Sequence, residues 1–235
     1  MANVYRRRRI VTAIISLIIL GMALVINQPA SQPIAKTPTA QSASDSTTTS
    51  PAIKALQALK IKGRAPKTDY TREQFGAGWT TLQGCDTRNI ILNRDLTNVQ
   101  IDESCNVTQG TLNDPYTGKI ITFVRSSATS GDVQIDHVVA LSDAWQKGAQ
   151  QLSKDKRIEL ANDPLELLAV DGPANQQKSD GDAATWLPPN KAFRCQYVTR
   201  QIAVKQKYNF WVTQAEHDAM SAVLQSCPEQ TLPKA

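Results

Sequence analysis

The stretch from residue 133 to residue 182 constrains the fold most, because two chemically reactive side chains, Asp136 and His137, lie inside an apolar run. Asp136 and His137 stand in VQIDHVV, whose β-branched residues predict a short strand with this polar pair at its exposed end. A second apolar run over residues 165–170 predicts another strand. A Gly-Pro pair then ends the run and favours a helix with proline in its first turn. The order expected is strand, loop, strand and helix.

The helix expected after residue 172 would carry Asn175, Lys178 and Asp180. A strand ending in Asp-His beside a helix bearing Asn would gather oxygen ligands and one imidazole around a divalent cation. Lys178 follows Asn175 by three positions and would share its helix face, where it could contact phosphate or be an ordinary solvated lysine. Asp180 and Asp182 could be outer ligands, or could belong to the loop that ends the helix.

Residues 1–26 predict export. Four arginines precede residues 10–26, which carry no charge, and this is the layout of a secretory signal or a signal anchor. No small-x-small cleavage site follows closely, so we favour an uncleaved anchor in the membrane through residues 10–26. Either form leaves the rest of the chain extracellular, secreted or tethered to the outer face of the cytoplasmic membrane.

The next segment, residues 27–52, is rich in Ser, Thr and Pro and predicts a disordered linker. Residues 53–235 are then expected to form the folded domain. The formal net charge of +5 comes mostly from the arginines at the N-terminus, because residues 53–235 contain 21 basic and 20 acidic residues. A nearly neutral domain must bind a polyanion through a local basic patch or a metal.

The four cysteines agree with export, since an even count in an exported chain indicates two disulfides. They are widely spaced and form no C-x-x-C motif, which argues against a zinc ribbon or a redox motif. Three pairings are possible, and four buried free thiols are the alternative. We favour Cys85 with Cys105 and Cys195 with Cys227, because each pair closes a local unit.

Hydrophobic spacing and turn residues outline the rest of the domain. The helices and strands expected from these signals predict an α+β domain with a small antiparallel sheet and surrounding helices. Thr213 and Glu216 have the spacing of a capping box. Helices are expected near residues 53–59, 90–94, within 141–163, 193–207 and 213–225, and strands near residues 99–101, 106–108 and 119–124.

Two histidines occur, His137 and His217, which excludes an H-E-x-x-H zinc site. His217 lies among apolar residues of an expected helix and is interpreted as structural. His137 follows an acid and is accompanied by an Asn-rich segment. A neutral imidazole with an ordinary pKa of about 6.5 is a suitable general base for phosphodiester hydrolysis.

Several motifs together resemble one family. They are IDHVVALSDAW, ANDPLELLAVDGPANQQKSDGDAATWLPPN, KGRAPKTDYTREQFG, CDTRNIIL and DPYTGK. Over about residues 56–228 the chain is similar to the secreted HNH endonuclease family related to GmrSD-type nuclease domains. The resemblance implies a ββα-metal core, in which a β-hairpin and a helix clamp one divalent cation.

The resemblance also assigns roles. It implies that His137 is the general base, that Asp136 is a metal ligand and that Asn175 is the second ligand. Asn162 matches the middle Asn of the motif, which would hold the loop and orient the histidine. Because the last position is Asn175 rather than histidine, a hard ion such as Mg²⁺ or Mn²⁺ is favoured over Zn²⁺.

The expected function is that of an exported, metal-dependent endonuclease acting on DNA, or on RNA, with low sequence specificity, because no base-reading module is visible. Lys191, Arg194, Arg200 and Lys205 could form a local substrate-binding patch or be ordinary surface charges. One rival is a catalytically silent extracellular module that binds nucleic acid or the envelope. Another is a cell-wall hydrolase with Asp136 and Glu166 as paired carboxylates. The residues do not indicate a protein partner.

Overall fold

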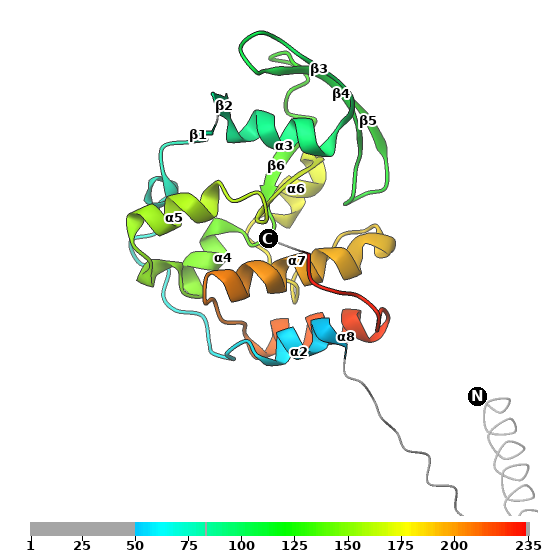
Figure 1. Cartoon of the computed structure of the whole chain (residues 1–235). Helices are drawn as coiled ribbons and strands as arrows, with labels where there is room; N and C mark the ends of the chain where they lie inside the picture. The colour runs from blue at the N-terminus through cyan, green and yellow to red at the C-terminus, as the bar shows by residue number, and fades with distance from the viewer. Residues whose placement is uncertain (1–49, 83, 234–235) are drawn as a thin grey trace, which may run out of the picture. The chain divides into compact units, whose positions relative to one another are not determined.

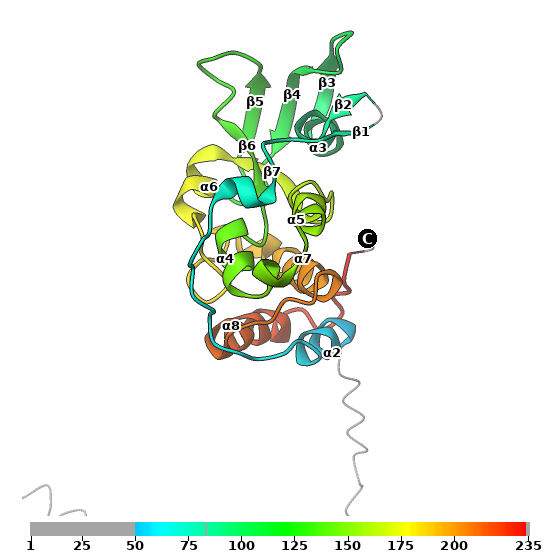
Figure 2. The ribbon, with the colours of Figure 1, turned by 90° about the vertical axis from the view of Figure 1, so that its left-hand side faces the viewer.

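A two-stranded antiparallel sheet lies at the centre of the domain, between two hydrophobic cores (Figures 1 and 2). Strand β6 (Val133–His137) pairs with β7 (Leu167–Asp171), with Val133 opposite Asp171 and His137 opposite Leu167. Side chains alternate between the two faces of a strand, so this pair contributes to both cores. Because both faces are covered, polar groups reach a cavity only at the edges and ends of these strands.

The computed structural model describes residues 50–82 and 84–233. The signal or anchor expected at residues 1–26, and the linker up to residue 49, lie outside the described residues. Helix α2 (Pro51–Gln57) already begins two residues before the expected domain boundary, and Ser50 caps it by accepting from the Ile53 amide. In the described part of the chain, no helix is long and apolar enough to cross a membrane.

Helix α6 (Gly172–Lys178) follows β7 without a loop. The Asp171 carboxylate accepts from the Ala174 amide and caps the helix, while Pro173 occupies its first turn, as the Gly-Pro pair predicts. Gly172 is required for close packing, since a Cβ atom there would lie 2.1 Å from the Gly131 carbonyl oxygen. The sequence of strand, strand and helix expected from residues 133–182 is therefore present.

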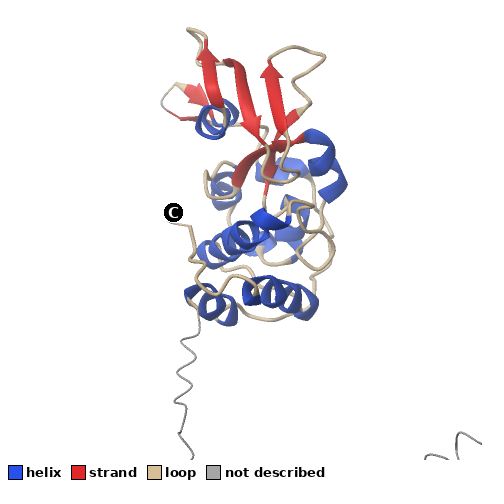
Figure 3. Ribbon diagram, turned by 90° about the vertical axis from the view of Figure 1, so that its right-hand side faces the viewer, coloured by secondary structure: helices blue, strands red, loops and turns tan. Residues whose placement is uncertain are grey.

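A three-stranded antiparallel sheet forms one end of the domain (Figure 3). Its strands lie in the order β3 (Thr97–Ile101), β4 (Val107–Asn113) and β5 (Ile120–Val124). Helix α3 (Thr87–Asp95) is capped by Asp86 and packs against β4, β6 and β7, and a short pair, β1 (Thr81–Leu82) and β2 (Cys85–Asp86), precedes it. The strand expected at 106–108 is longer than predicted, because β4 pairs with β5 from Gln109 to Asn113.

Helices form the other part of the domain, with α2 and α8 farthest from the three-stranded sheet (Figures 1 and 2). The two helices expected near 193–207 and 213–225 are confirmed. The remaining elements are η1 (Arg72–Phe75), α4 (Leu141–Gln146), η2 (Ala149–Gln151), α5 (Lys154–Ala161), η3 (Lys191–Phe193), α7 (Arg194–Lys207) and α8 (Gln214–Gln225). The α+β class predicted from the sequence is confirmed.

Both predicted disulfides are present. Cys85 joins Cys105 with a Cα–Cα distance of 5.4 Å, and Cys195 joins Cys227 at 6.4 Å. The first connects β2, which directly precedes α3, to the turn between β3 and β4. The second connects the start of α7 to the end of α8. Each closes a local unit, which is the reason the sequence favoured this pairing.

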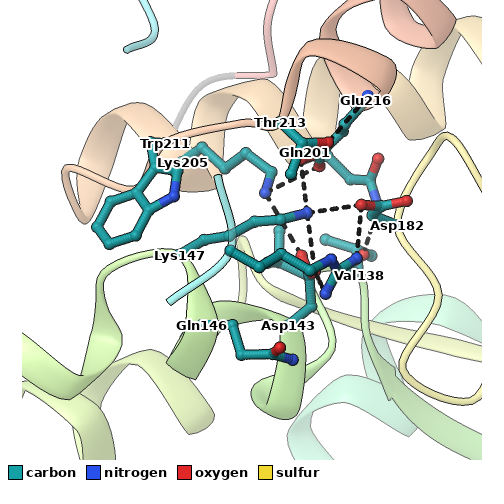
Figure 4. A network of polar contacts seen from close by, with 12 residues as sticks. Val138, Asp143, Gln146, Lys147, Asp182, Gln201, Lys205, Trp211, Thr213 and Glu216 are labelled. Carbon is teal, nitrogen blue, oxygen red and sulfur yellow. Dashed lines mark hydrogen bonds and ion pairs between the residues drawn. The ribbon is translucent and has the colours of Figure 1, made fainter. Parts of the chain in front are cut away.

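A buried ionic cluster connects the helical part to the loop after α6 (Figure 4). Its members are Arg64, Lys147, Lys205, Asp143, Asp182 and Glu216. The Lys147 amine lies 2.8, 2.7 and 2.6 Å from carboxylate oxygens of Asp143, Asp182 and Glu216. Three cations and three carboxylates balance, so no member is left as an isolated buried charge.

Glu216 corrects one detail of the sequence analysis. Thr213 caps α8 by accepting from the Glu216 amide, as expected. The Glu216 carboxylate, however, contacts Lys147 and Lys205 instead of returning to the backbone amide of Thr213. The reciprocal half of the capping box is lost, because a buried carboxylate is stabilised more by two ammonium groups than by one amide.

Replacing Lys147 by methionine tests how much this cluster contributes to the stability of the fold. The Lys147→Met protein would leave three buried carboxylates with too little positive charge, so we expect the free energy of unfolding to fall by about 3 to 5 kcal/mol in urea titrations. The matched control is Lys156→Met, because Lys156 makes an exposed pair with Glu159. This control should unfold at the wild-type urea concentration. Equal stability of the two variants would contradict a structural role for the cluster.

Candidate functional site

A cavity of about 580 Å³ opens beside the end of β6. Residues from β6, α6, α3 and the segment before Thr80 reach it, and α4 contributes its first turn. The chemically active groups that line it are Arg72, Arg88, Gln134, Asp136, His137 and Asn175. Asp136, His137 and Asn175, which the sequence analysis selected as ligands and base, therefore share one cavity.

The orientation of His137 is fixed by a backbone carbonyl. Its Nε2 lies 3.0 Å from the Ala161 oxygen, at the end of α5. A carbonyl only accepts, so Nε2 carries the hydrogen and Nδ1 of the neutral imidazole keeps its lone pair. No residue in the described ranges forms a hydrogen bond with Nδ1. The ring also stacks on Trp79, with centroids 5.9 Å apart and planes 6° from parallel.

Burial keeps this imidazole neutral. It lowers the pKa of His137 to about 3, and the neighbouring cations Arg72 and Lys178 act in the same direction. The hydrogen bond to Ala161 opposes the shift but is the smaller effect. At neutral pH the side chain is therefore unprotonated at Nδ1, but in the free protein it is a weaker base than the imidazole with an ordinary pKa of about 6.5 that was expected from the sequence.

Asp136 is buried on the other face of the strand. The Lys178 amine donates to its Oδ1 at 2.8 Å, and the Tyr116 hydroxyl donates to Oδ2. Lys178 also donates to the carbonyl oxygen of His137 at 2.7 Å. Burial raises the pKa of Asp136, while the charge of Lys178 and the two hydrogen bonds limit this rise. The lysine thus bonds to both residues of the Asp-His pair.

Asn175 lies on α6 and reaches the same cavity. Its Nδ2 donates to Gln134 Oε1 at 2.8 Å, which turns the side-chain oxygen of Asn175 away from Gln134. Asn162 ends α5 at its C-terminus. Its Oδ1 accepts from the Thr80 amide at 2.9 Å, and its Nδ2 donates to the Ile158 carbonyl oxygen. Asn162 therefore holds the loop that carries Trp79, and its neighbour Ala161 holds the histidine.

The donor chemistry fits a hard divalent cation. Within the residues that the structure describes, no three His, Cys, Asp or Glu side chains come together as a metal cluster. Two carboxylates, Asp136 and Asp180, and two amide side chains, Gln134 and Asn175, nevertheless line the cavity, and Asp180 lies just beyond the end of α6 instead of on the helix. Mg²⁺ and Mn²⁺ accept such oxygen donors, and Mg²⁺ keeps several of its own waters, whereas Zn²⁺ prefers nitrogen and sulfur.

The cations at the cavity differ from those expected. Lys178 is buried and its amine is engaged by Asp136 and His137, so this geometry gives it no phosphate contact. None of the four predicted residues Lys191, Arg194, Arg200 and Lys205 is among those that line the cavity. Arg194 and Arg200 donate to backbone carbonyl oxygens, and Lys205 is buried in the ionic cluster. Lys67, Arg72 and Arg88 line it instead.

These three residues were not predicted, although each lies in a motif that carries the family resemblance: Lys67 and Arg72 in KGRAPKTDYTREQFG, and Arg88 in CDTRNIIL. Arg88 is held in place, because its guanidinium donates to the carbonyl oxygens of Ser130 and Val133. The paired carboxylates of a cell-wall hydrolase gain no support from the geometry. Glu166 is fully buried, its carboxylate accepts from the Val139 amide, and it does not line the cavity.

The state of His137 can be measured directly by NMR of protein labelled with ¹⁵N-histidine. We expect the neutral Nε2–H tautomer throughout pH 5 to 8, because the folded-state pKa is about 3. The unfolded value is about 6.5, so the contribution of this group to stability is lost as the pH falls from about 6.5 towards the folded value. Spectra of the His217→Gln variant show which of the imidazole ¹⁵N signals belong to His137. A titration of His137 midway between pH 6 and 7 would contradict the buried geometry.

Comparison with known proteins identifies the family of the chain. The family described as GmrSD restriction endonucleases, C-terminal domain, matches residues 86–223, which include β6, β7, α6 and the cavity residues on them. The chain is also 37% identical over 214 residues to a protein of Arthroderma benhamiae described as an uncharacterized secreted protein, covering 90% of this chain and 98% of that protein. The chain belongs to the family of the C-terminal domain of GmrSD restriction endonucleases.

Proposed function

We propose that the chain is an exported, metal-dependent endonuclease that hydrolyses phosphodiester bonds of DNA with low sequence specificity. The observation that carries the proposal is the position of His137. Its neutral imidazole shares a cavity with Asp136, Asn175, Arg72 and Arg88. A base, oxygen ligands and cations for phosphate are the three groups that this reaction requires.

Family membership supports a nuclease-related function. The relative described as secreted and the two disulfides support export, because disulfides persist in oxidising compartments. Whether residues 10–26 tether the protein to a membrane remains a proposal of the sequence alone.

In the proposed mechanism, His137 takes the proton of the attacking water at Nδ1, while its Nε2–H stays bonded to the Ala161 carbonyl oxygen. Arg72 and Arg88 hold the non-bridging oxygens of the phosphate and stabilise the charge that develops on them. A divalent cation held by Asp136 and Asn175 would neutralise the charge on the leaving 3′ oxygen. Lys178 acts behind the site by fixing Asp136 and the backbone of His137.

Recognition through phosphate explains the low specificity. Phosphate contacts fix the position of a nucleic acid but carry no base sequence. The cations at the cavity, Lys67, Arg72 and Arg88, supply local positive charge in a domain that is almost neutral overall. The same contacts are possible with RNA, so RNA is an alternative substrate in the assays below.

A catalytically silent binding module is the second candidate, and one observation favours it. Both carboxylate oxygens of Asp136 already have protein partners, Lys178 and Tyr116. A cation would have to bind beside these partners or displace one of them. The silent module predicts oligonucleotide binding without cleavage.

Cleavage of supercoiled plasmid tests the enzyme against the silent module. With Mg²⁺ or Mn²⁺ we expect nicking that EDTA abolishes. The His137→Ala variant lacks the proposed base, so we expect it to cleave about 10²- to 10⁴-fold more slowly than the wild type. His217→Ala is the matched control, because His217 lies on α8 and does not line the cavity. The nuclease proposal would be contradicted if the oxidised wild-type protein bound DNA but did not cleave it with any of the divalent ions. This result would favour the silent module.

A second pair of variants tests which cations contact the substrate. Arg72→Met should lower kcat/KM about 10- to 100-fold, because a charged hydrogen bond contributes about 1.5 to 3 kcal/mol. Lys191→Met removes an exposed cation that does not line the cavity, and should retain the wild-type rate. The reverse ranking would return the substrate patch to Lys191, where the sequence alone placed it.

A further inference from the structure

A second cavity adjoins the site. Its volume is about 270 Å³, and it shares Arg72, Trp79, His137 and Leu141 with the larger cavity. The imidazole of His137 therefore stands at the boundary between the two. A nucleic acid whose phosphate lies beside His137 in the larger cavity has its neighbouring sugar and base within reach of the smaller one.

The two cavities differ in chemistry. The larger one is lined by three cations and by carboxylate and amide groups. The smaller one is lined by the rings of Phe75 and Trp79, by Leu141 and by the backbone of residues 76–78, with Glu73 and Arg72 as its charged groups. Nucleic acids alternate in the same way between a charged phosphate and a flat, largely uncharged base. Aromatic rings with a few polar groups are the usual surface for an unstacked base.

The backbone at the smaller cavity is open to a ligand. Gly76 has a φ of +100°, and a Cβ atom there would lie 3.3 Å from the Ile158 side chain, so the turn requires glycine. In the described part of the chain, the amides of Ala77 and Gly78 donate to no other residue. These donors, and the exposed carboxylate of Glu73 as an acceptor, suit the polar edge of a base.

A base in a duplex cannot enter such a cavity. It is stacked on both faces and paired along its edge, and it must leave the stack before a pocket can enclose it. Unstacking costs least in a single strand or at an unpaired position. The cavity therefore selects for nucleic acid whose bases are free.

On this basis, and resting on the proposed function, we propose that the smaller cavity is a subsite for one unpaired nucleobase next to the cleaved phosphate. The substrate class is then single-stranded nucleic acid, or a duplex at an unpaired base. Trp79 contacts the base and also supports His137, so a test must separate these two roles.

The test uses short single-stranded oligonucleotides with one cleavable phosphodiester and either a normal or an abasic nucleotide on each side of it. For wild type with Mg²⁺ or Mn²⁺, loss of the base on one side should lower kcat/KM about 10- to 100-fold, the effect of one aromatic stacking contact. Trp79→Leu should show a similar loss on the normal substrate but little further loss on the abasic one. Trp79→Phe, which keeps a ring, should retain most of the base dependence.

The outcomes distinguish a base subsite, a role of Trp79 that is limited to positioning His137, and a protein that binds nucleic acid without cleaving it. If Trp79 only positions His137, Trp79→Leu lowers the rate on normal and abasic substrates by the same factor, and the subsite is refuted. Equal wild-type cleavage of normal and abasic substrates, or faster cleavage of the matched duplex, also refutes it. Binding of the oligonucleotides to His137→Ala, followed by fluorescence anisotropy, is read independently of cleavage. Base-dependent binding without wild-type cleavage would refute the nuclease and keep the subsite, whereas base-independent binding would refute the subsite.

Discussion

The buried ammonium of Lys178 is the interaction on which the site depends. An unpaired buried charge costs several kcal/mol, so this amine must have oxygen partners, and it finds them in Asp136 and in the carbonyl group of His137. Both partners belong to β6, while the lysine belongs to α6. The charge therefore fixes the helix to the strand beside the cavity that Asp136, His137 and Asn175 line. Hydrophobic packing alone would allow the helix to slide or rotate, since apolar contacts are not directional.

The ionic cluster on the other side of the same loop extends this constraint. Asp182 follows α6 by a few residues and accepts from Lys147 and Arg64. The site helix is thus held at its C-terminal end by Lys178 and, just beyond it, by Asp182. Such clusters add specificity more than stability, because each ion loses its hydration on burial. Their geometric demand suits a site in which small displacements of the ligands would matter.

The local features were predictable from the sequence and the long-range ones were not. The strands around Asp136 and the helix after residue 172 follow from patterns within a few residues, and so does the favoured disulfide pairing. The direction of Lys178 was undecided, because spacing gives a helix face but not what packs against that face. Lys191 and Arg194 were chosen as nearby cations in the chain, although the residues that line the cavity come from distant segments.

Lys67 and Arg72 come from a segment without regular periodicity, residues 63–80, which other parts of the fold hold by hydrogen bonds to Trp145, Arg157 and Asn162. It carries Arg72 to the cavity, where one charge has two effects. In the proposed function Arg72 would attract phosphate, and its charge also disfavours the imidazolium form of His137, so that this side chain stays neutral in the free protein. A bound phosphodiester brings negative charge and offsets the arginine. The proton affinity of His137 would then rise when the substrate binds. Through the charge of Arg72, substrate binding would therefore make His137 a stronger base.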